Sequence, residues 1–266
     1  MKCPLCKSND PLIEYYGETK VSKCVYCKLW FIPDKINEDY YFSYFNDFRA
    51  NEVKRNRLRN KQYLIDAEHL YRYVKEGLLL DVGCSTGQFA REVNKKGQFE
   101  ILGIDIDYNA IKIANTQIQE RISFQHCKIT DLNNKKLFNA IIFRGTFQYM
   151  GKHFQKNIRK IYSLLKPNGL VIIYCLPNSY SYIFHLVREN WWLFNPTEHK
   201  LIFNKESITF LANKYNFQIL EFTFPYEDTA YANIRKDYQA TIDIITKKTK
   251  SSPPFWGNIM QIVLKK

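Results

Sequence analysis

The feature that most constrains the fold is an apolar segment that ends in an acid and leads directly into a glycine-containing turn. Residues 77–82 read Gly-Leu-Leu-Leu-Asp-Val, and the turn that follows carries Gly83 and Gly87. A helical pattern begins immediately afterwards, so this stretch predicts a strand, a tight loop and a helix. Glycines at such a turn let a ligand approach the backbone closely. Their Gly-x-x-x-Gly spacing matches neither the dinucleotide fingerprint nor a phosphate-binding loop, which disfavours a diphosphate ligand.

A second segment repeats the arrangement of a strand that ends in an acid. Residues 100–105 end in Asp105, which lies 18 residues beyond Gly87 and close to the roughly 20 expected for a ribose-binding carboxylate. Strand and helix patterns alternate through the rest of the chain, which predicts a parallel sheet covered by helices and closed by an antiparallel pair. We expect helices over 109–117, 152–165 and 205–215, and further strands over 121–125, 138–144, 170–175, 217–224 and 258–264.

The two strand ends resemble those of the class I S-adenosylmethionine-dependent methyltransferases. The first motif of that family reads acid-x-Gly-x-Gly-x-Gly, and Asp81, Gly83 and Gly87 match it. Ser85, which is also small, stands in the place of the middle glycine. The resemblance implies an α/β fold with a Rossmann-like seven-stranded methyltransferase sheet and S-adenosylmethionine as the cofactor.

The same resemblance implies roles for single residues. Asp81 would orient the methionine amino group, and Asp105 would accept hydrogen bonds from the ribose hydroxyls. Relatives usually carry an acid after the third strand that contacts the adenine. Lys128 occupies that position here, so backbone groups near Lys128 and Ile129 are expected to replace it. The expected cofactor-binding residues are Asp81, Gly83, Cys84, Ser85, Gly87, Asp105, Ile106 and Ile129.

Four of the seven cysteines form two Cys-x-x-Cys pairs near the N-terminus. Cys3 and Cys6 are separated from Cys24 and Cys27 by 17 residues. Four thiolates complete a tetrahedral shell around zinc and leave no position open for a catalytic water. We therefore expect residues 1–38 to form a zinc ribbon with a structural ion. A disulfide pair or unrelated cysteines is the alternative.

Two residues are candidates for acid–base chemistry. Tyr149 follows the fourth strand, where relatives commonly show a Leu-Glu-His trio. Here the trio reads Phe-Gln-Tyr, so Tyr149 stands in the place of the histidine. His199 lies in a Pro-x-x-His segment before an aromatic residue and a helix, as in related enzymes of surface-glycan and natural-product pathways. We expect His199 to serve as a base and Tyr149 to line the acceptor pocket. The alternatives are a structural histidine and a packing tyrosine.

The pattern along the chain divides it into three parts. Residues 1–38 form the ribbon, 39–76 a helical linker and 77–266 the methyltransferase domain, in which 177–203 and 225–257 are segments on the substrate side. No apolar stretch approaches the roughly 18–20 residues of a membrane span. No signal-peptide pattern follows Met1, so we expect a cytoplasmic protein.

The acceptor is the least constrained part of the prediction. The ribbon and the aromatic segment after it are similar to the start of bacterial methyltransferases that act on surface-polysaccharide or secondary-metabolite precursors. O-methylation of a sugar or another small molecule is therefore our first hypothesis. An rRNA base methyltransferase is the alternative, because some of these enzymes resemble this chain in carrying a small zinc module of similar size before the same core. A basic run that would track phosphates in that case comprises Arg49, Lys54, Arg55, Arg57, Arg59 and Lys61.

Overall fold

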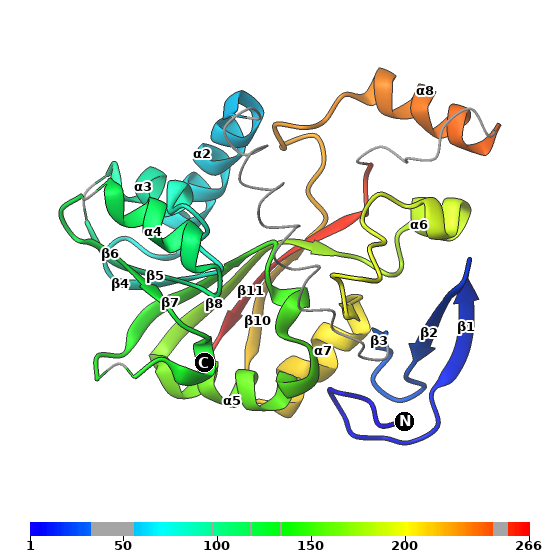
Figure 1. The fold of residues 1–266 in the computed structure, drawn as a ribbon, viewed down its shortest axis with the longest axis horizontal. Coiled ribbons are helices and arrows are strands. Elements are labelled where there is room, and N and C mark those ends of the chain that lie inside the picture. The colour runs from blue at the N-terminus through cyan, green and yellow to red at the C-terminus, as the bar shows by residue number, and fades with distance from the viewer. Residues whose placement is uncertain (33–55, 97, 118, 134, 247–254) are drawn as a thin grey trace.

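The computed structural model describes residues 1–32, 56–96, 98–117, 119–133, 135–246 and 255–266. Its centre is a seven-stranded sheet with the order β10-β11-β8-β7-β4-β5-β6 (Figure 1). The strands are β4 (Gly77–Val82), β5 (Phe99–Asp105), β6 (Ile122–His126), β7 (Phe138–Arg144), β8 (Leu165–Pro177), β10 (Gln218–Thr223) and β11 (Ile259–Lys265).

The pairing within this sheet is parallel except at one end. β4 pairs in parallel with β5 and β7, and the parallel pairing continues to β6 and β8. β11 runs antiparallel to both β8 and β10. The predicted Rossmann-like sheet with its antiparallel end is confirmed. β8 begins earlier than the predicted strand at 170–175, because Leu165 already pairs with Phe138 of β7.

Helices cover both faces of the sheet (Figure 1). Leu79 packs with α2 and α3, whereas its neighbours Leu78 and Leu80 pack on the side of α5 and α7. This alternation follows from the two-residue period of a strand, and burial on both faces explains why the strands read as nearly continuous apolar runs. The helices of the two layers are α2 (Asn56–Tyr73), α3 (Gln88–Asn94), α4 (Tyr108–Thr116), α5 (Phe154–Leu164) and α7 (Lys205–Lys214).

A second, four-stranded sheet joins the N-terminal module to a distant segment. β1 (Leu12–Tyr16), β2 (Thr19–Lys23) and β3 (Trp30–Phe31) form an antiparallel meander, and β9 (Leu201–Ile202) adds the fourth strand. Trp30 pairs with Ile202, and Phe31 pairs with Leu201. The sequence analysis did not foresee this pairing. It attaches the cysteine module directly to the segment 177–203.

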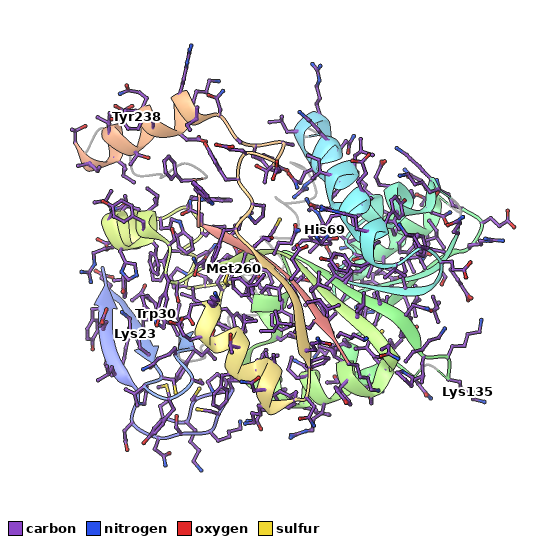
Figure 2. All side chains as sticks on the ribbon, turned by 180° about the vertical axis from the view of Figure 1, so that it is seen from behind. Lys23, Trp30, His69, Lys135, Tyr238 and Met260 are labelled. Atoms are coloured by element: carbon purple, nitrogen blue, oxygen red, sulfur yellow. The ribbon has the colours of Figure 1, made fainter. Side chains whose placement is uncertain are left out.

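The segment 225–257 leaves the sheet between its last two strands and carries a helix that the sequence analysis did not predict. This helix is α8 (Ile234–Ile245), which lies near α6 (Tyr182–Val187). Buried Asp237 fixes α8 by accepting a hydrogen bond from the Tyr226 hydroxyl. Figure 2 shows Tyr238 on α8, where it is 62% exposed, whereas Met260 of β11 lies inside the core.

In the described part of the chain, no helix combines the length and the apolar character that crossing a membrane requires. Short 3-10 segments lie at Ile129–Asp131, Phe147–His153 and Arg188–Asn190 in this part of the chain, and the second is interrupted by a kink at Gly151.

The cysteine module shares one hydrophobic core with α5, α7 and β9, so we expect the two parts to unfold together. Leu29 follows the second cysteine pair and is fully buried in that core. Leu29→Ala should lower the free energy of unfolding of the whole chain by about 2–5 kcal/mol. Val25, on the same turn and 39% exposed, offers the control, since Val25→Ala should change it by less than about 0.5 kcal/mol. Urea unfolding followed by circular dichroism gives both values, and two separate transitions would contradict the shared core.

Candidate cofactor and acceptor site

The loop after β4 adopts a conformation that its two glycines make possible. Gly83 and Gly87 both have φ of +78°. A Cβ atom on Gly83 would lie 2.3 Å from the Thr146 side chain, and one on Gly87 would lie 2.3 Å from the Phe124 ring. Packing and backbone conformation therefore both require glycine at these positions. The result is a tight loop at the carboxyl end of β4, where ligands bind in open α/β sheets.

Asp105 closes this loop from the neighbouring strand. One carboxylate oxygen accepts a 2.8 Å hydrogen bond from the Ser85 backbone, and the other accepts one of 2.8 Å from the Asp107 backbone. Burial raises the pKa of Asp105, while these backbone donors oppose the rise. A carboxylate oxygen accepts more than one hydrogen bond. Asp105 therefore keeps acceptor capacity for a ligand hydroxyl.

The buried carboxylate of Asp81, just before this loop, would be stabilised by a cationic partner. Its side chain is 2% exposed, and its Oδ2 atom has no hydrogen-bond partner among the described residues. Burial raises the pKa of Asp81 to about 7, with the Arg144 charge opposing and the Asp105 charge adding to the shift. A buried carboxylate oxygen without a partner is costly. An ammonium group of a ligand would satisfy it, as the predicted role requires.

The other predicted cofactor residues lie around the same strand ends. Cys84 is buried beneath the loop, and burial raises the pKa of its thiol well above the ordinary value. Ile106 follows β5 and is 51% exposed, so an apolar side chain faces outward beside Asp105. Ile129 is buried at the start of a 3-10 turn, next to Lys128. An exposed Ile106 next to Asp105 suits a flat ring that sits beyond the ribose.

Arg144, the last residue of β7, was not among the predicted site residues. Its Nε donates a 2.7 Å hydrogen bond to the Asp66 carboxylate on α2, and its guanidinium lies over the Tyr63 ring at 4.3 Å from the centroid. The signal that would have found it is a charged residue at the end of an otherwise apolar strand. Its positive charge is close enough to Asp81 to lower the pKa of that carboxyl.

The structure brings Tyr149 and His199 together, although they lie 50 residues apart in the chain. The Tyr149 hydroxyl donates a 3.2 Å hydrogen bond to the Glu198 carboxylate, and its oxygen lies 3.1 Å from His199 Nε2. His199 Nδ1 lies 2.8 Å from the Leu193 carbonyl, so it carries the hydrogen and leaves Nε2 as an acceptor. Burial lowers the pKa of His199 below its ordinary value, with the Leu193 carbonyl opposing. This shift favours the neutral imidazole.

Glu198 completes this group and was also not predicted. Its second carboxylate oxygen accepts a 2.7 Å hydrogen bond from the Asn195 side chain, and only 5% of Glu198 is exposed. His199 is 7% exposed, whereas Tyr149 is half-buried. Tyr149 is therefore the most exposed residue of this group.

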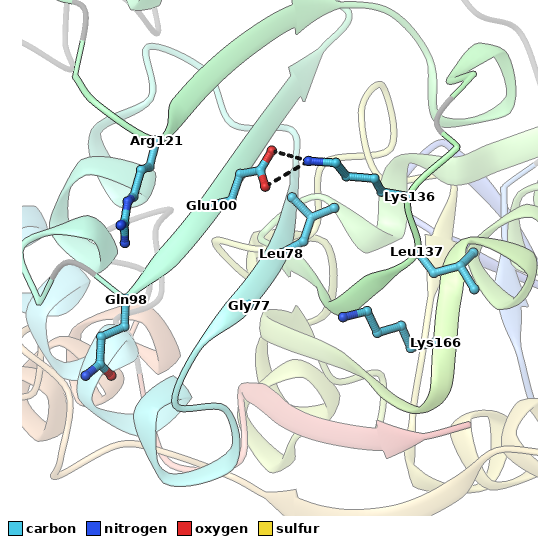
Figure 3. A pocket seen from close by; sticks show the side chains of 8 residues that line it. All are labelled: Gly77, Leu78, Gln98, Glu100, Arg121, Lys136, Leu137 and Lys166. Carbon is cyan, nitrogen blue, oxygen red and sulfur yellow. Dashed lines mark hydrogen bonds and ion pairs between the residues drawn. The ribbon is translucent and has the colours of Figure 1, made fainter.

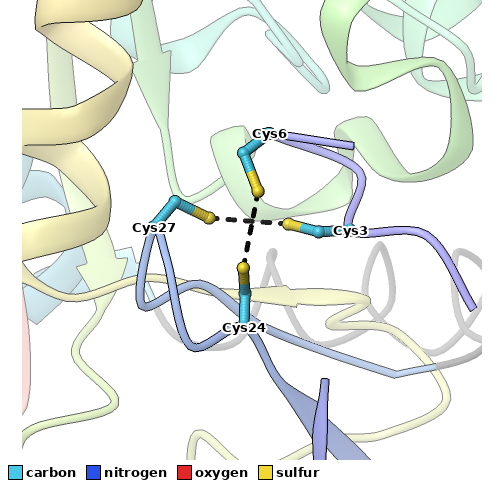
Figure 4. A group of neighbouring side chains, drawn as sticks. All are labelled: Cys3, Cys6, Cys24 and Cys27. Carbon is cyan, nitrogen blue, oxygen red and sulfur yellow. Dashed lines mark hydrogen bonds between the residues drawn. The ribbon is translucent and has the colours of Figure 1, made fainter. Parts of the chain in front are cut away.

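The four cysteines of the N-terminal pairs converge on one point (Figure 4). Cys3 and Cys27 are 3.5 Å apart at sulfur, Cys6 and Cys24 are 3.4 Å apart, and all four sulfurs lie within 4.8 Å of one another. Four sulfurs at the usual 2.3 Å from zinc stand about 3.8 Å apart. The spacing thus fits one tetrahedral metal ion, and no disulfide links these cysteines.

The hollow in Figure 3 is not part of this site. It lies at the opposite end of the strands, where Gly77 begins β4, and Lys136 and Lys166 stand at its edge. Lys136 forms an ion pair with Glu100 at 3.2 Å. No predicted site residue lines this hollow. Of the basic run, Arg57, Arg59 and Lys61 lie on α2, while Arg49, Lys54 and Arg55 fall outside the described residues.

A family model described as a methyltransferase domain matches residues 45–221, which is more than half of the chain. The chain belongs to this methyltransferase family. The match begins before the loop after β4 and ends within β10. It therefore includes Asp81, Asp105, Tyr149 and His199, but not the cysteine pairs.

Single relatives agree with the family assignment. A protein of Geobacillus sp. (strain WCH70) that is named as a methyltransferase is 31% identical over 111 residues, which is 39% of this chain and 44% of its own length. A malonyl-[acyl-carrier protein] O-methyltransferase of Calditerrivibrio nitroreducens is 31% identical over 91 residues, or 34% of this chain and 35% of its own. The chain thus spans less than half the length of these two relatives.

A solved structure extends the similarity to nearly the whole fold. The 1,6-didemethyltoxoflavin-N1-methyltransferase of Burkholderia thailandensis, solved with S-adenosylhomocysteine and 1,6-didemethyltoxoflavin, is 12% identical with a TM-score of 0.57. The superposition covers 96% of this chain and 98% of that one. At this identity the similarity establishes the shared fold.

The raised pKa of Asp81 predicts a pH dependence of cofactor binding. Only the ionised carboxylate pairs with the ligand ammonium, so the affinity for S-adenosylhomocysteine should fall about tenfold per pH unit below pH 7. At pH 6 binding should also release close to one proton. Calorimetry in buffers of different ionisation enthalpy measures both effects. Asp81→Asn should bind weakly with a flat pH profile, and a wild-type affinity that does not change between pH 6 and 8 would contradict the assignment.

Proposed function

We propose that this protein transfers the methyl group of S-adenosylmethionine to a hydroxyl of a small molecule or glycan precursor, with Tyr149 and His199 as the base. The observation that carries the proposal is the 3.1 Å contact between the Tyr149 hydroxyl and Nε2 of the buried His199, whose pKa is lowered by burial. An acceptor that is already nucleophilic does not need a base to remove a proton before it attacks the methyl group. A hydroxyl, by contrast, must lose its proton as it attacks.

The loop residues support the cofactor part of the proposal. Asp81 offers an acceptor for the methionine ammonium, Asp105 offers acceptors for the ribose hydroxyls, and Ile106 an apolar surface for the adenine. The bound cofactor supplies an activated sulfonium methyl group. The protein's part is then to align acceptor and methyl group, because orientation provides much of the rate in such a displacement.

The order of proton transfer follows from the hydrogen bonds. Since His199 Nδ1 is held by Leu193, its Nε2 lone pair points to the Tyr149 hydroxyl. Tyr149 would turn its hydrogen from Glu198 to His199 Nε2 and pass it to the imidazole, while its oxygen takes the proton of the acceptor hydroxyl. Glu198, 3.2 Å from the same oxygen, would stabilise the imidazolium that results.

The names of the relatives point to small acceptor groups but do not agree on one acceptor. One relative is named for the methylation of a malonyl group on its carrier protein, and a structural neighbour is named for the methylation of a toxoflavin precursor. Both names describe small acceptor groups. They support a small-molecule acceptor here, and the sugar or surface-polysaccharide precursor is the finer part of our proposal.

We further propose that Cys3, Cys6, Cys24 and Cys27 hold one structural zinc ion. Both cysteine turns place a lysine with positive φ after the second cysteine, Lys7 at 68° and Lys28 at 59°. The two turns thus share one geometry and present their thiolates to a common point. Since β3 pairs with β9 two residues after His199, the ion would hold the segment that carries the base.

The pair Tyr149 and His199 predicts a selective loss of turnover. Tyr149→Phe removes one oxygen and His199→Asn removes the base, and each should lower kcat by about 10²–10⁴. The affinity for S-adenosylhomocysteine should stay within a factor of about two, because neither residue belongs to the loop after β4. Methyl transfer from labelled cofactor to a panel of sugars and sugar nucleotides measures kcat, and calorimetry measures affinity.

The matched control is Tyr15→Phe, since Tyr15 is 60% exposed on β1. It should keep the wild-type kcat. Full activity of both site variants would remove the base from the proposal. Salt-sensitive methyl incorporation into unmodified rRNA, with none into small molecules, would replace our first hypothesis by the rRNA alternative.

The cysteine cluster predicts one zinc ion per chain and a stability that depends on it. Elemental analysis of metal-replete protein should find one equivalent, and Cys24→Ser should lose most of it. Because a bound ligand stabilises the folded state by mass action, chelation should lower the Tm of the whole chain. Cys127→Ser is the control, since Cys127 lies outside the cluster, and it should retain the metal. Wild-type protein without zinc and with an unchanged Tm under chelation would refute the site.

A further inference from the structure

Three charged side chains lie on one face of three neighbouring strands. In β5, β4 and β7, the residues Ile101, Leu79 and Ile142 pack into the core beneath α2 and α3. Side chains alternate between the two faces of a strand. Asp105, Asp81 and Arg144 therefore point to the same face, each at or near the carboxyl end of its strand.

The register sets the spacing of these charges. Asp81 pairs with Gly103 on one side and with Ile142 on the other. Arg144 lies two residues beyond Ile142, which places its Cα about 7 Å further along β7. The charges thus follow one another across the sheet edge as Asp105, Asp81 and Arg144. If one end of a ligand binds Asp105 and its middle binds Asp81, its other end lies near Arg144.

The Arg144 guanidinium is fixed but not saturated. Its Nε is engaged by Asp66 at 2.7 Å, and the Tyr63 ring supports its plane. Its two terminal amino groups make no hydrogen bond within the described ranges, and 14% of the side chain is exposed. The Asp66 carboxylate thus orients the guanidinium while the donors at its far end remain available. Planar donor pairs of this kind match a carboxylate.

We infer that Arg144 receives the carboxylate of the cofactor's methionine moiety, next to the ammonium held by Asp81. This inference rests on the proposed cofactor. The ammonium and carboxylate of an amino acid are bonded to the same carbon, so the partners of both must lie side by side. Asp81 and Arg144 supply that pair of opposite charges. In agreement with this arrangement, the Arg144 charge lowers the pKa of Asp81.

The test compares two ligands that differ in the amino-acid part. S-adenosylhomocysteine carries the ammonium and carboxylate, whereas 5′-methylthioadenosine lacks both. Arg144→Gln should weaken S-adenosylhomocysteine about tenfold to hundredfold, as expected for one charge-assisted hydrogen-bond partner. The affinity for 5′-methylthioadenosine should stay unchanged. Calorimetry on the full chain gives both constants, without an acceptor.

Loss of Arg144 alone leaves the Asp66 carboxylate buried without its partner, which threatens the fold. The double variant Asp66→Asn/Arg144→Gln removes that charge and should show the same selective loss. Arg144→Lys should lie between the wild type and Arg144→Gln, because it keeps the charge but not the paired donors. The matched control is Arg159→Gln, at an exposed position of α5 on the other face of the sheet, and it should bind both ligands normally.

Each alternative result has one meaning. Equal weakening of both ligands in the double variant would show that the Arg144–Asp66 pair only supports the fold, and would overturn the inference. Unchanged affinity for both ligands would overturn it as well. Wild-type protein that binds neither ligand would refute the proposed cofactor itself. These results keep a failure of the inference distinct from a failure of the proposed function.

Discussion

The parallel register of β5, β4 and β7 is the constraint on which the site depends. Parallel strands end at the same edge of the sheet, and their two-residue period sends every second side chain to the same face. Asp105, Asp81 and Arg144 are brought together by this rule alone. The tight loop with Gly83 and Gly87 has no side chains at these two positions, so a ligand can reach the three charged residues. The electrostatics of the site are thus a consequence of strand pairing.

The pairing of β3 with β9 connects the rest of the molecule to this edge. It attaches the cysteine cluster to the segment that carries Glu198 and His199. The same segment delivers His199 to Tyr149, which follows β7 at the carboxyl edge of the sheet. A metal ion in the cluster and a base at the acceptor site would therefore be parts of one mechanical unit. In our proposal, the structural ion would then support the position of the base without contacting the acceptor.

The sequence was sufficient wherever a function depends on a local pattern. Asp81 and Asp105 were predicted because each ends an apolar strand, and the cysteine pairs were predicted because their spacing is fixed by tight turns. The parallel sheet covered by helices followed from the alternation of strand and helix patterns, and its seven strands from the resemblance to the methyltransferases. Arg144 was missed, because the orientation of its guanidinium depends on Asp66 and Tyr63 of α2, which lie far away in the sequence. Glu198 was missed for the same reason.

The sequence by itself determined the methyltransferase fold, the loop after β4 and the four cysteines, because strand patterns, glycine conformation and ligand spacing act over short stretches of chain. Only the tertiary structure decided that Tyr149 meets His199, that β9 extends the N-terminal sheet, and that Arg144 stands beside Asp81. Those contacts join residues 50 or more positions apart. They arise from how whole elements pack, and packing depends on the shapes of all the side chains between them.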